Sequence, residues 1–285
     1  MYNISIITPT KNSEKYILDN LESVHLNQNL HNINIEHIII DGNSTDKTMG
    51  IIEQFKDEHN STNIKLIESK DDRGMYDAIN KGMQNISGDI WATLNSDDVY
   101  NENTLQLVIN TFRNNQNDLE VVYGNVDMID GNSKFIHTLY LPNFNIEYLV
   151  LKGYCLTILM PALFLRKSVI GKVGYYDINY KYASDYDYCI RLGLSCKLKR
   201  ISQSLTKYRM HLGSITWGDG ERRKIQTQET KDISNKYMSK LNIPQKGILF
   251  GDATMYLNQI HYNNLNYISV RIKEIMINKI FGANK

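Results

Sequence analysis

Cysteine, proline and tryptophan are scarce in this chain, which contains 3, 4 and 2 of them among 285 residues. The cysteine count is odd and no Cys-x-x-Cys pair occurs, so a disulfide framework and a cysteine zinc site are disfavoured and a reducing compartment fits best. Basic and acidic residues nearly balance, at 32 and 31, and give a net charge of +1. This balance provides no overall field for a polyanion, so we expect no nucleic-acid partner.

Long apolar runs are missing as well. The first residues show no basic segment followed by an apolar core, the pattern of a signal peptide. The longest apolar-rich run, 155–165, contains Pro161 and is shorter than the roughly 20 residues that span a bilayer. We therefore expect a cytoplasmic protein, with peripheral contact at the inner face of a membrane as an open alternative.

Apolar strand patterns alternate with helical patterns through the first hundred residues. Strands are predicted at 4–8, 36–40, 64–67 and 90–94, and each is followed by polar residues and, for the most part, by apolar residues at 3–4 spacing. Such alternation predicts an α/β fold with a mostly parallel sheet flanked by helices. Further strands are expected at 120–123, 134–141, 157–166, 196–201 and 205–210.

The composition becomes polar and helical near residue 219, which predicts a catalytic domain over 1–217 and a helical extension over 218–285. The tail at 268–281 places its isoleucines on one stripe and its basic residues off that stripe. A helix of this kind can pack against its own domain or a second subunit, or lie on anionic lipid. The sequence favours the packed helix and leaves a homodimer and a membrane contact open.

Two adjacent carboxylates, Asp97 and Asp98, follow the apolar strand at 90–94. In open α/β sheets ligands bind at the carboxyl ends of the strands. Neighbouring strand residues point to opposite sides, so one carboxylate could meet a sugar hydroxyl and the other a Mg²⁺ or Mn²⁺ ion. The alternative is a turn or a helix cap. No Walker lysine motif or G-x-G-x-x-G turn occurs, so a phosphate would have to be anchored by a metal.

Asp41 and the Asp72–Arg73 pair lie in other loops that follow predicted strands. Asp41 precedes Gly42 and could accept the imide N–H of a uracil, or it could cap the helix that begins near Ser44. Arg73 could reach a diphosphate, or it could form a surface ion pair.

Asp185 and His211 lie farther along the chain. Asp185 begins a predicted helix, apart from the metal pair, where it could act as a general base or favour the helix N-terminus electrostatically together with Asp187. His211 follows the last predicted strand and could complete a metal site or bind a phosphate, although a single histidine is more often structural.

Taken together, these residues resemble the family 2 inverting glycosyltransferases with the GT-A fold. The resemblance covers about residues 4 to 215, with five motifs in the family's order: Thr8-Pro9-Thr10-Lys11-Asn12, Asp41-Gly42-Asn43-Ser44-Thr45-Asp46, Asp72-Arg73-Gly74, Asn95-Ser96-Asp97-Asp98 and Ala183-Ser184-Asp185-Tyr186-Asp187. Leu159-Met160-Pro161 departs from the family, since close relatives often have a polar His or Gln there.

The resemblance implies a Rossmann-like, mostly parallel mixed sheet, a nucleotide-diphospho-sugar donor that is usually UDP-linked, and Mn²⁺ or Mg²⁺. The implied acceptor is a hydroxyl of a saccharide or a lipid-linked sugar, attacked in one inverting displacement with Asp185 as the base. The nucleotide sugar would bind at Thr8, Pro9, Asn12, Asp41, Asp72, Arg73 and Asp97, and the metal at Asp98 and His211.

Two rival interpretations remain from the sequence. A sugar-phosphate nucleotidyltransferase shares the strand-end carboxylates, but it expects a glycine-rich loop after the first strand, and residues 8–12 lack glycine. A non-catalytic nucleotide-sugar-binding partner in an assembly is disfavoured by the complete set of Asp97, Asp98 and Asp185.

Overall fold

The computed structural model describes residues 2–26, 33–61, 63–115, 118–152, 158–211 and 220–243. The tail predicted to be helical at 268–281 lies outside these ranges, as does much of the predicted extension. Among the described residues, none of the helices combines the length and the apolar character that crossing a bilayer demands. The cytoplasmic location, the membrane contact and the homodimer therefore stay predictions.

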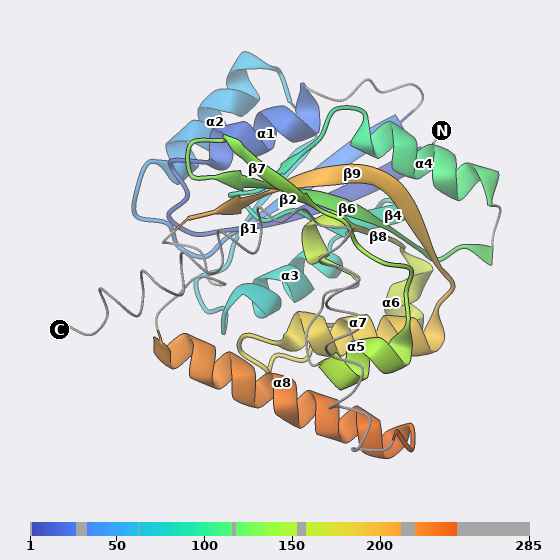
Figure 1. Cartoon of the computed structure of the whole chain (residues 1–285). Coiled ribbons are helices and arrows are strands. Elements are labelled where there is room, and N and C mark those ends of the chain that lie inside the picture. Colours follow the sequence, from blue (N-terminus) through green and yellow to red (C-terminus); the bar gives the residue numbers. More distant parts are fainter. Residues whose placement is uncertain are drawn as a thin grey trace. The chain divides into compact units, whose positions relative to one another are not determined.

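A single mixed sheet forms the centre of the described structure (Figure 1). Its order is β3-β2-β1-β4-β8-β6-β9-β5, and β7 pairs with β6. The first four strands are mutually parallel and β9 runs parallel to β6, whereas β5, β7 and β8 pair in antiparallel fashion. The strands are β1 Tyr2–Thr10, β2 Ile33–Asp41, β3 Ile64–Glu68, β4 Ile90–Thr93, β5 Val99–Tyr100, β6 Val121–Asp130, β7 Phe135–Leu139, β8 Leu163–Arg166 and β9 Leu198–Met210. The predicted mostly parallel mixed sheet is confirmed.

Helices cover both faces of this sheet, with α1, α2 and α4 on one side and α3 and α5 to α7 on the other (Figure 1). Their bounds are α1 Ile17–His25, α2 Thr48–Glu58, α3 Met75–Met83, α4 Thr104–Asn114, α5 Ile146–Lys152, α6 Ser168–Val173, α7 Ser184–Ser195 and α8 Gly220–Lys240, and η2 is a 3₁₀ turn at Met160–Ala162. Ile17, Leu21 and Val24 are fully buried, as their helical spacing predicts.

The central strands are apolar on both faces because helices cover both sides. Ile38, Ile39 and Ile40 are all completely buried, and such continuous apolar runs are typical of strands in a doubly covered parallel sheet. Pro9 lies within β1, beyond the predicted strand end. Pairing of β1 with β4 stops at Ile7, so Pro9 pairs with β2 alone and its missing N–H is tolerated.

The prediction of two strands at 196–201 and 205–210 was wrong, because one continuous strand, β9, spans Leu198–Met210. Its register against β6 shifts between Tyr123 and Asn125. Gly124 allows the close approach at this bulge, since a β-carbon there would lie 2.6 Å from Leu205 Cγ. The irregular register places polar residues 202–204 inside a strand, where they break the alternation that sequence patterns require.

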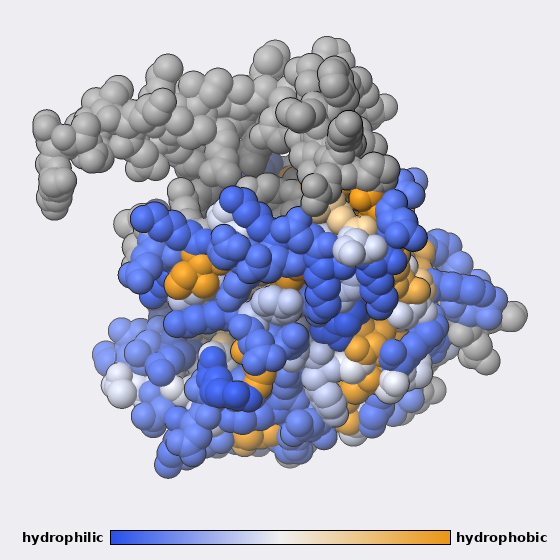
Figure 2. All heavy atoms as spheres, turned by 90° about the horizontal axis from the view of Figure 1, so that it is seen from below, coloured by the Kyte–Doolittle hydropathy of each residue, from blue (hydrophilic) through white to orange (hydrophobic). Residues whose placement is uncertain are grey.

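One compact unit comprises Met1–Tyr237, and a second begins at Met238. The predicted domain boundary at 217 stays a prediction. Most of α8 belongs to the first unit. Its Ser234 hydroxyl donates to the Val150 carbonyl of α5 at 2.6 Å, and its Tyr237 hydroxyl donates to Asp187 of α7 at 3.0 Å. The polar composition near residue 219 reflects a helix with one solvated side, and the face seen from below in Figure 2 is mainly hydrophilic.

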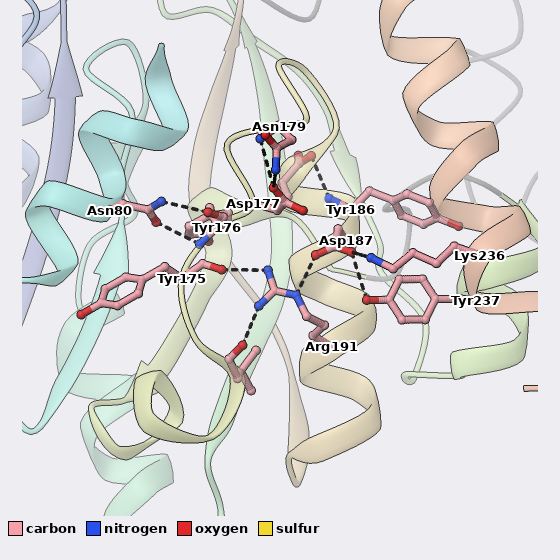
Figure 3. A network of polar contacts seen from close by, with 12 residues as sticks. Asn80, Tyr175, Tyr176, Asp177, Asn179, Tyr186, Asp187, Arg191, Lys236 and Tyr237 are labelled. Atoms are coloured by element: carbon pink, nitrogen blue, oxygen red, sulfur yellow. Dashed lines mark hydrogen bonds and ion pairs between the residues drawn. The ribbon is translucent and has the colours of Figure 1, made fainter. Parts of the chain in front are cut away.

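Asp187 is the charged centre of the contact between α7 and α8 (Figure 3). Its side chain is 2% exposed, pairs with Arg191 at 2.6 Å and Lys236 at 3.3 Å, and accepts from Tyr237. We expect Asp187→Asn to lower the free energy of unfolding by about 2 kcal/mol, since hydrogen bonds to a buried charge are lost. Denaturant unfolding measures this, with exposed Asp232→Asn on α8 as the control. Equal losses in the two variants would contradict the assignment.

Two histidines, His25 of α1 and His37 of β2, make the fold sensitive to acid. His37 is fully buried, and its ring nitrogens contact Thr8 Oγ1 at 2.8 Å and His25 Nε2 at 3.1 Å. Burial lowers the pKa of His25 from 6.5 to about 4, with a further lowering by His59, and burial lowers the pKa of His37 well below 6.5. The unfolded chain therefore binds more protons than the folded chain below pH 6.5.

Stability should consequently fall as the pH drops from about 6.5 to about 4, by up to about 1.4 kcal/mol per pH unit for each histidine. Chemical unfolding at a series of pH values measures the slope. His25→Gln should make the slope shallower, and an unchanged slope in that variant would refute this explanation.

Candidate active site

The loops that follow β1, β2 and β4 are joined to one another by polar contacts at the carboxyl edge of the sheet. The Ser13 hydroxyl lies 2.7 Å from the Ser96 hydroxyl, which connects the first loop to the loop that carries Asp97. The Asn12 N–H donates to Ser44 Oγ at 2.9 Å, and Asn12 Oδ1 accepts from the Thr45 N–H at 2.8 Å. Three segments that are distant in sequence therefore form one structured edge.

Asp41 ends β2 and lines a cavity of about 180 Å³. Its carboxylate is nearly buried and accepts from both the N–H and the hydroxyl of Ser44, which orders the loop after β2. The alternative role as a helix cap was wrong, because α2 begins only at Thr48 and its N-cap residue is Lys47. The same cavity is also lined by Lys70, which supplies a positive charge. Asp41 thus combines a local structural role with access to a space that a ligand could enter.

Asp72 and Arg73 lie in the loop between β3 and α3. Asp72 Oδ2 would be 3.4 Å from a β-carbon built on Gly42, which brings the loops after β2 and β3 together. Gly74 has φ of 122°, a conformation that favours glycine and allows the turn into α3. Arg73 is exposed and its N–H donates to Asp77 at 3.0 Å, so its guanidinium side chain extends from a fixed backbone.

Thr8 and Pro9 belong to the interior at this edge. Both are buried, and Thr8 Oγ1 is directed to His37 rather than toward the cavity. The structure therefore leaves only their backbone for a contact with a nucleoside.

The two carboxylates after β4 have opposite environments. Asp98 is 1% exposed, and its oxygens accept from the Arg209 N–H at 2.9 Å and the Asn95 amide at 3.3 Å. Burial and the nearby charge of Asp97 raise the pKa of Asp98 well above 3.8. A carboxylate enclosed in this way is less accessible to a cation than that of Asp97, and the assignment of the metal to Asp98 stays a prediction.

Asp97 has the accessible position. Its side chain is 23% exposed, and its carboxylate lies 2.8 Å from Nε2 of His211, whose side chain is 20% exposed. The His211 ring also packs against Tyr16, with 4.9 Å between ring centroids. The structure therefore brings together two residues that are 114 positions apart in the chain and that the sequence had proposed separately.

Arg209 and Asn20 organise this pair, and the sequence analysis did not identify either. Arg209 is 1% exposed, and its Nε donates to the Asp97 carbonyl at 2.8 Å. Asn20 of α1 is fully buried and donates to the carbonyls of Asn95 and Asp98, at 2.9 and 3.0 Å. A polar Asn on the apolar stripe of α1 was the available signal for Asn20, whereas Arg209 resembled any strand-end arginine.

Asp185 lies in the first turn of α7 and contacts the start of α3. The hydroxyl of Tyr76, the second residue of α3, hydrogen-bonds to the Asp185 carboxylate and lies 3.4 Å from the Tyr182 carbonyl. Burial raises the pKa of Asp185 above 3.8, against the lowering effect of Tyr76. A partly exposed carboxylate with a raised pKa is suited to accept a proton.

Further contacts between α3 and the segment before α7 hold the backbone that leads to Asp185 in place (Figure 3). Asn80 donates to the Tyr176 carbonyl and accepts from the Tyr176 N–H, both at 2.9 Å. The Tyr176 ring stacks on Tyr76 and on Tyr188, with centroid distances of 5.6 and 4.2 Å. These contacts connect α3 to α7, the helix that carries Asp185.

The possible metal ligands at this edge of the sheet suit a divalent cation that takes most of its ligands from a substrate. Among the described residues no group of three or more His, Cys, Asp or Glu side chains could hold a metal. Asp97 and His211 together supply one carboxylate and one imidazole, and Mg²⁺ or Mn²⁺ commonly binds one or two protein groups plus phosphate and water. The residues present therefore fit such an ion.

A mixed α/β sheet with acidic side chains at the carboxyl edge of its parallel strands is the arrangement of an α/β enzyme that binds its ligand at that edge. The family model described as glycosyl transferase family 2 matches residues 5–174. This protein belongs to glycosyl transferase family 2 and is an enzyme of the glycosyltransferase type.

Several curated proteins are similar to it. A dolichyl N-acetyl-alpha-D-glucosaminyl phosphate 3-beta-D-2,3-diacetamido-2,3-dideoxy-beta-D-glucuronosyltransferase of Methanococcus voltae is 43% identical over 88 residues, which are 31% of this chain and 27% of that protein. A PGL/p-HBAD biosynthesis glycosyltransferase of Mycobacterium bovis is 30% identical over 66% of this chain and 68% of its own length. The chain thus matches about a quarter of the methanococcal protein.

Solved structures share the fold. Residues 1–349 of S. aureus TarS in complex with UDP-GlcNAc give a TM-score of 0.60 at 21% identity, over 74% of this chain and 60% of that one. A mannosyltransferase of Pyrobaculum calidifontis in complex with GDP-Man and Mn²⁺ gives a TM-score of 0.57 at 13% identity, over 89% and 80%. The predicted GT-A fold is confirmed by these glycosyltransferase neighbours.

Proposed function

We propose that this glycosyltransferase transfers a sugar from a UDP-linked donor to an acceptor hydroxyl with inversion at the anomeric carbon. The observation that carries the proposal is the contact of Tyr76 in α3 with the partly exposed carboxylate of Asp185, since α3 directly follows the loop of Asp72 and Arg73. A base beside the donor can deprotonate an acceptor as it attacks. One displacement from the face opposite the leaving diphosphate inverts the configuration.

Each side chain has a part in this proposal. Asp41 accepts from the uracil imide at the cavity edge, and Arg73 reaches the diphosphate from its exposed position. Asp185 takes the proton of the acceptor hydroxyl. Thr8 and Pro9 contribute their backbone, and Asn12 fixes the loop around Asp41.

Asp97 and His211 would hold Mn²⁺ or Mg²⁺ in this proposal. When bound, such an ion stabilises the charge that develops on a leaving diphosphate and orients that group. The neighbour in complex with GDP-Man and Mn²⁺ supports this part. Arg209 and Asn20 keep the backbone of 95–98 in place, so that the Asp97 carboxylate meets His211 at the accessible side.

The donor and acceptor are proposed at the level of chemical class. The neighbour in complex with UDP-GlcNAc supports a UDP-linked donor. Names of the relatives refer to a dolichyl N-acetyl-alpha-D-glucosaminyl phosphate and to PGL/p-HBAD biosynthesis. They support a saccharide or lipid-linked acceptor, which must approach from the side of α7 to reach Asp185.

A donor panel tests the proposal. We expect release of UDP from one or more of a set of UDP-sugars in the presence of Mn²⁺, with little release of GDP from GDP-mannose. An NMR spectrum of a product formed with a saccharide acceptor should show the inverted anomer. Nucleotide release that is equal with and without Mn²⁺, or a product that retains configuration, would contradict the proposal.

A further inference from the structure

Glu229 of α8 binds a row of backbone N–H groups directly before α7. Its Oε1 accepts from the Lys181 N–H at 2.7 Å, and its Oε2 accepts from the N–H groups of Tyr182 and Ala183 at 2.8 and 3.0 Å. Ala183 is the N-cap residue of α7, and Asp185 follows two positions later. One carboxylate from a distant helix therefore fixes the backbone that leads into the catalytic turn.

Two carboxylates bind N–H groups at the N-terminus of α7. Asp185 Oδ1 accepts from the Tyr186 N–H at 2.9 Å within the first turn, and Glu229 binds the N–H of the N-cap residue from α8. The N-cap residue, Ala183, has no side-chain hydrogen bond that caps the helix. Ser184 Oγ is buried and has no hydrogen-bond partner among the residues that the structure describes. Backbone N–H groups at a helix start need acceptors, and a negative charge there is favourable. Glu229 supplies both.

The remaining contacts of α8 fix the position from which Glu229 acts. Lys236 and Tyr237, two turns farther along α8, bind the Asp187 carboxylate of α7 (Figure 3). Asp187 in turn pairs with Arg191, whose guanidinium donates to the Val173 and Tyr175 carbonyls. The two helices are therefore joined at Asp187 and at the N-terminal approach to α7, with Asp185 between these points.

We propose that Glu229 is a positioning residue for the general base: it orders residues 181–183 so that Asp185 faces the acceptor. This inference rests on the proposed function. It also extends the catalytic machinery to α8, which lies beyond the family match at 5–174.

The charge of Glu229 gives the proposal a distinct signature. Burial is the largest cause that raises the pKa of Asp185, and the negative charge of Glu229 raises it further. Removing that charge should lower the pKa of Asp185, so the base should remain deprotonated to a lower pH. A residue whose charge does not act on Asp185 would not move this property.

The test compares Glu229→Gln and Glu229→Ala with Glu221→Gln, an exposed glutamate in the first turn of α8. With the UDP-sugar that turns over in the donor panel, Glu229→Ala should lower kcat by about ten- to a hundredfold and leave the donor KM within about twofold. Glu229→Gln keeps an acceptor oxygen and should lose less activity. Its acidic limb of kcat against pH should move to lower pH, while Glu221→Gln should match the unmodified enzyme.

An unchanged kcat in Glu229→Ala, or an acidic limb that stays in place in Glu229→Gln, would overturn the proposal. UDP titration by calorimetry shows that each variant is folded, and where Glu229→Ala fails this check the pH profile of Glu229→Gln decides. Asp185→Asn distinguishes a failure of the proposed function from a failure of the role proposed for Glu229. If that variant turns over normally, the assignment of the base is wrong; if it is inactive while both Glu229 variants behave like the unmodified enzyme, only the role of Glu229 is wrong.

Discussion

Asp185→Asn should abolish sugar transfer while leaving nucleotide binding in place. The amide cannot accept the acceptor's proton, and loss of a general base typically costs on the order of 10²- to 10⁴-fold in rate. The substitution preserves shape, and the amide oxygen can still accept the hydrogen bond that Tyr76 directs at this position. Steady-state kinetics with the donor of the panel measures kcat, and calorimetry with UDP measures binding.

The pH dependence of the transfer rate is a second test of Asp185. Burial raises the pKa of Asp185 above 3.8, and the base acts only when deprotonated. Transfer should therefore decline as the pH falls through a value higher than that of an ordinary aspartate. Glu147→Gln, at a carboxylate on α5 outside the proposed site, is a suitable control. Normal turnover in Asp185→Asn would require a different base.

Asp97→Asn should remove metal-dependent turnover, with a loss of about a hundredfold or more. Asp97 is the accessible carboxylate of the pair and lies 2.8 Å from His211. Manganese affinity, followed by the loss of the free-ion signal in electron paramagnetic resonance in the presence of UDP, should weaken in parallel. Thermal unfolding should change little because the side chain is partly solvated.

Asp98→Ala is the matched comparison. It should lower the stability of the protein more than Asp97→Asn does, and its manganese affinity less. It leaves the Arg209 N–H and the Asn95 amide without their acceptor, which should lower the free energy of unfolding by about 1 to 3 kcal/mol. Manganese affinity of the folded protein should fall less than in Asp97→Asn. Stronger loss of manganese in Asp98→Ala than in Asp97→Asn would return the metal to Asp98.

Local patterns in the sequence are sufficient to predict most of this fold. The apolar runs of β1, β2 and β4 and the 3–4 spacing of Ile17, Leu21 and Val24 follow from burial on known periods, and the structure confirms them. Polar residues directly after these strands indicate the edge where ligands bind. These features depend on neighbours along the chain, which a sequence displays.

The sequence alone could not show which of Asp97 and Asp98 is accessible to solvent, because adjacent carboxylates have the same chemistry. In the structure Asp98 is the buried one, and it accepts from the Arg209 N–H. Nor could the sequence show that Glu229, far along the chain, binds the backbone before Asp185. Both depend on contacts between segments that are distant in sequence. Chemical type and order along the chain therefore determined the family and the edge of the site, whereas burial and long-range hydrogen bonds in the tertiary structure determined the environment of each carboxylate.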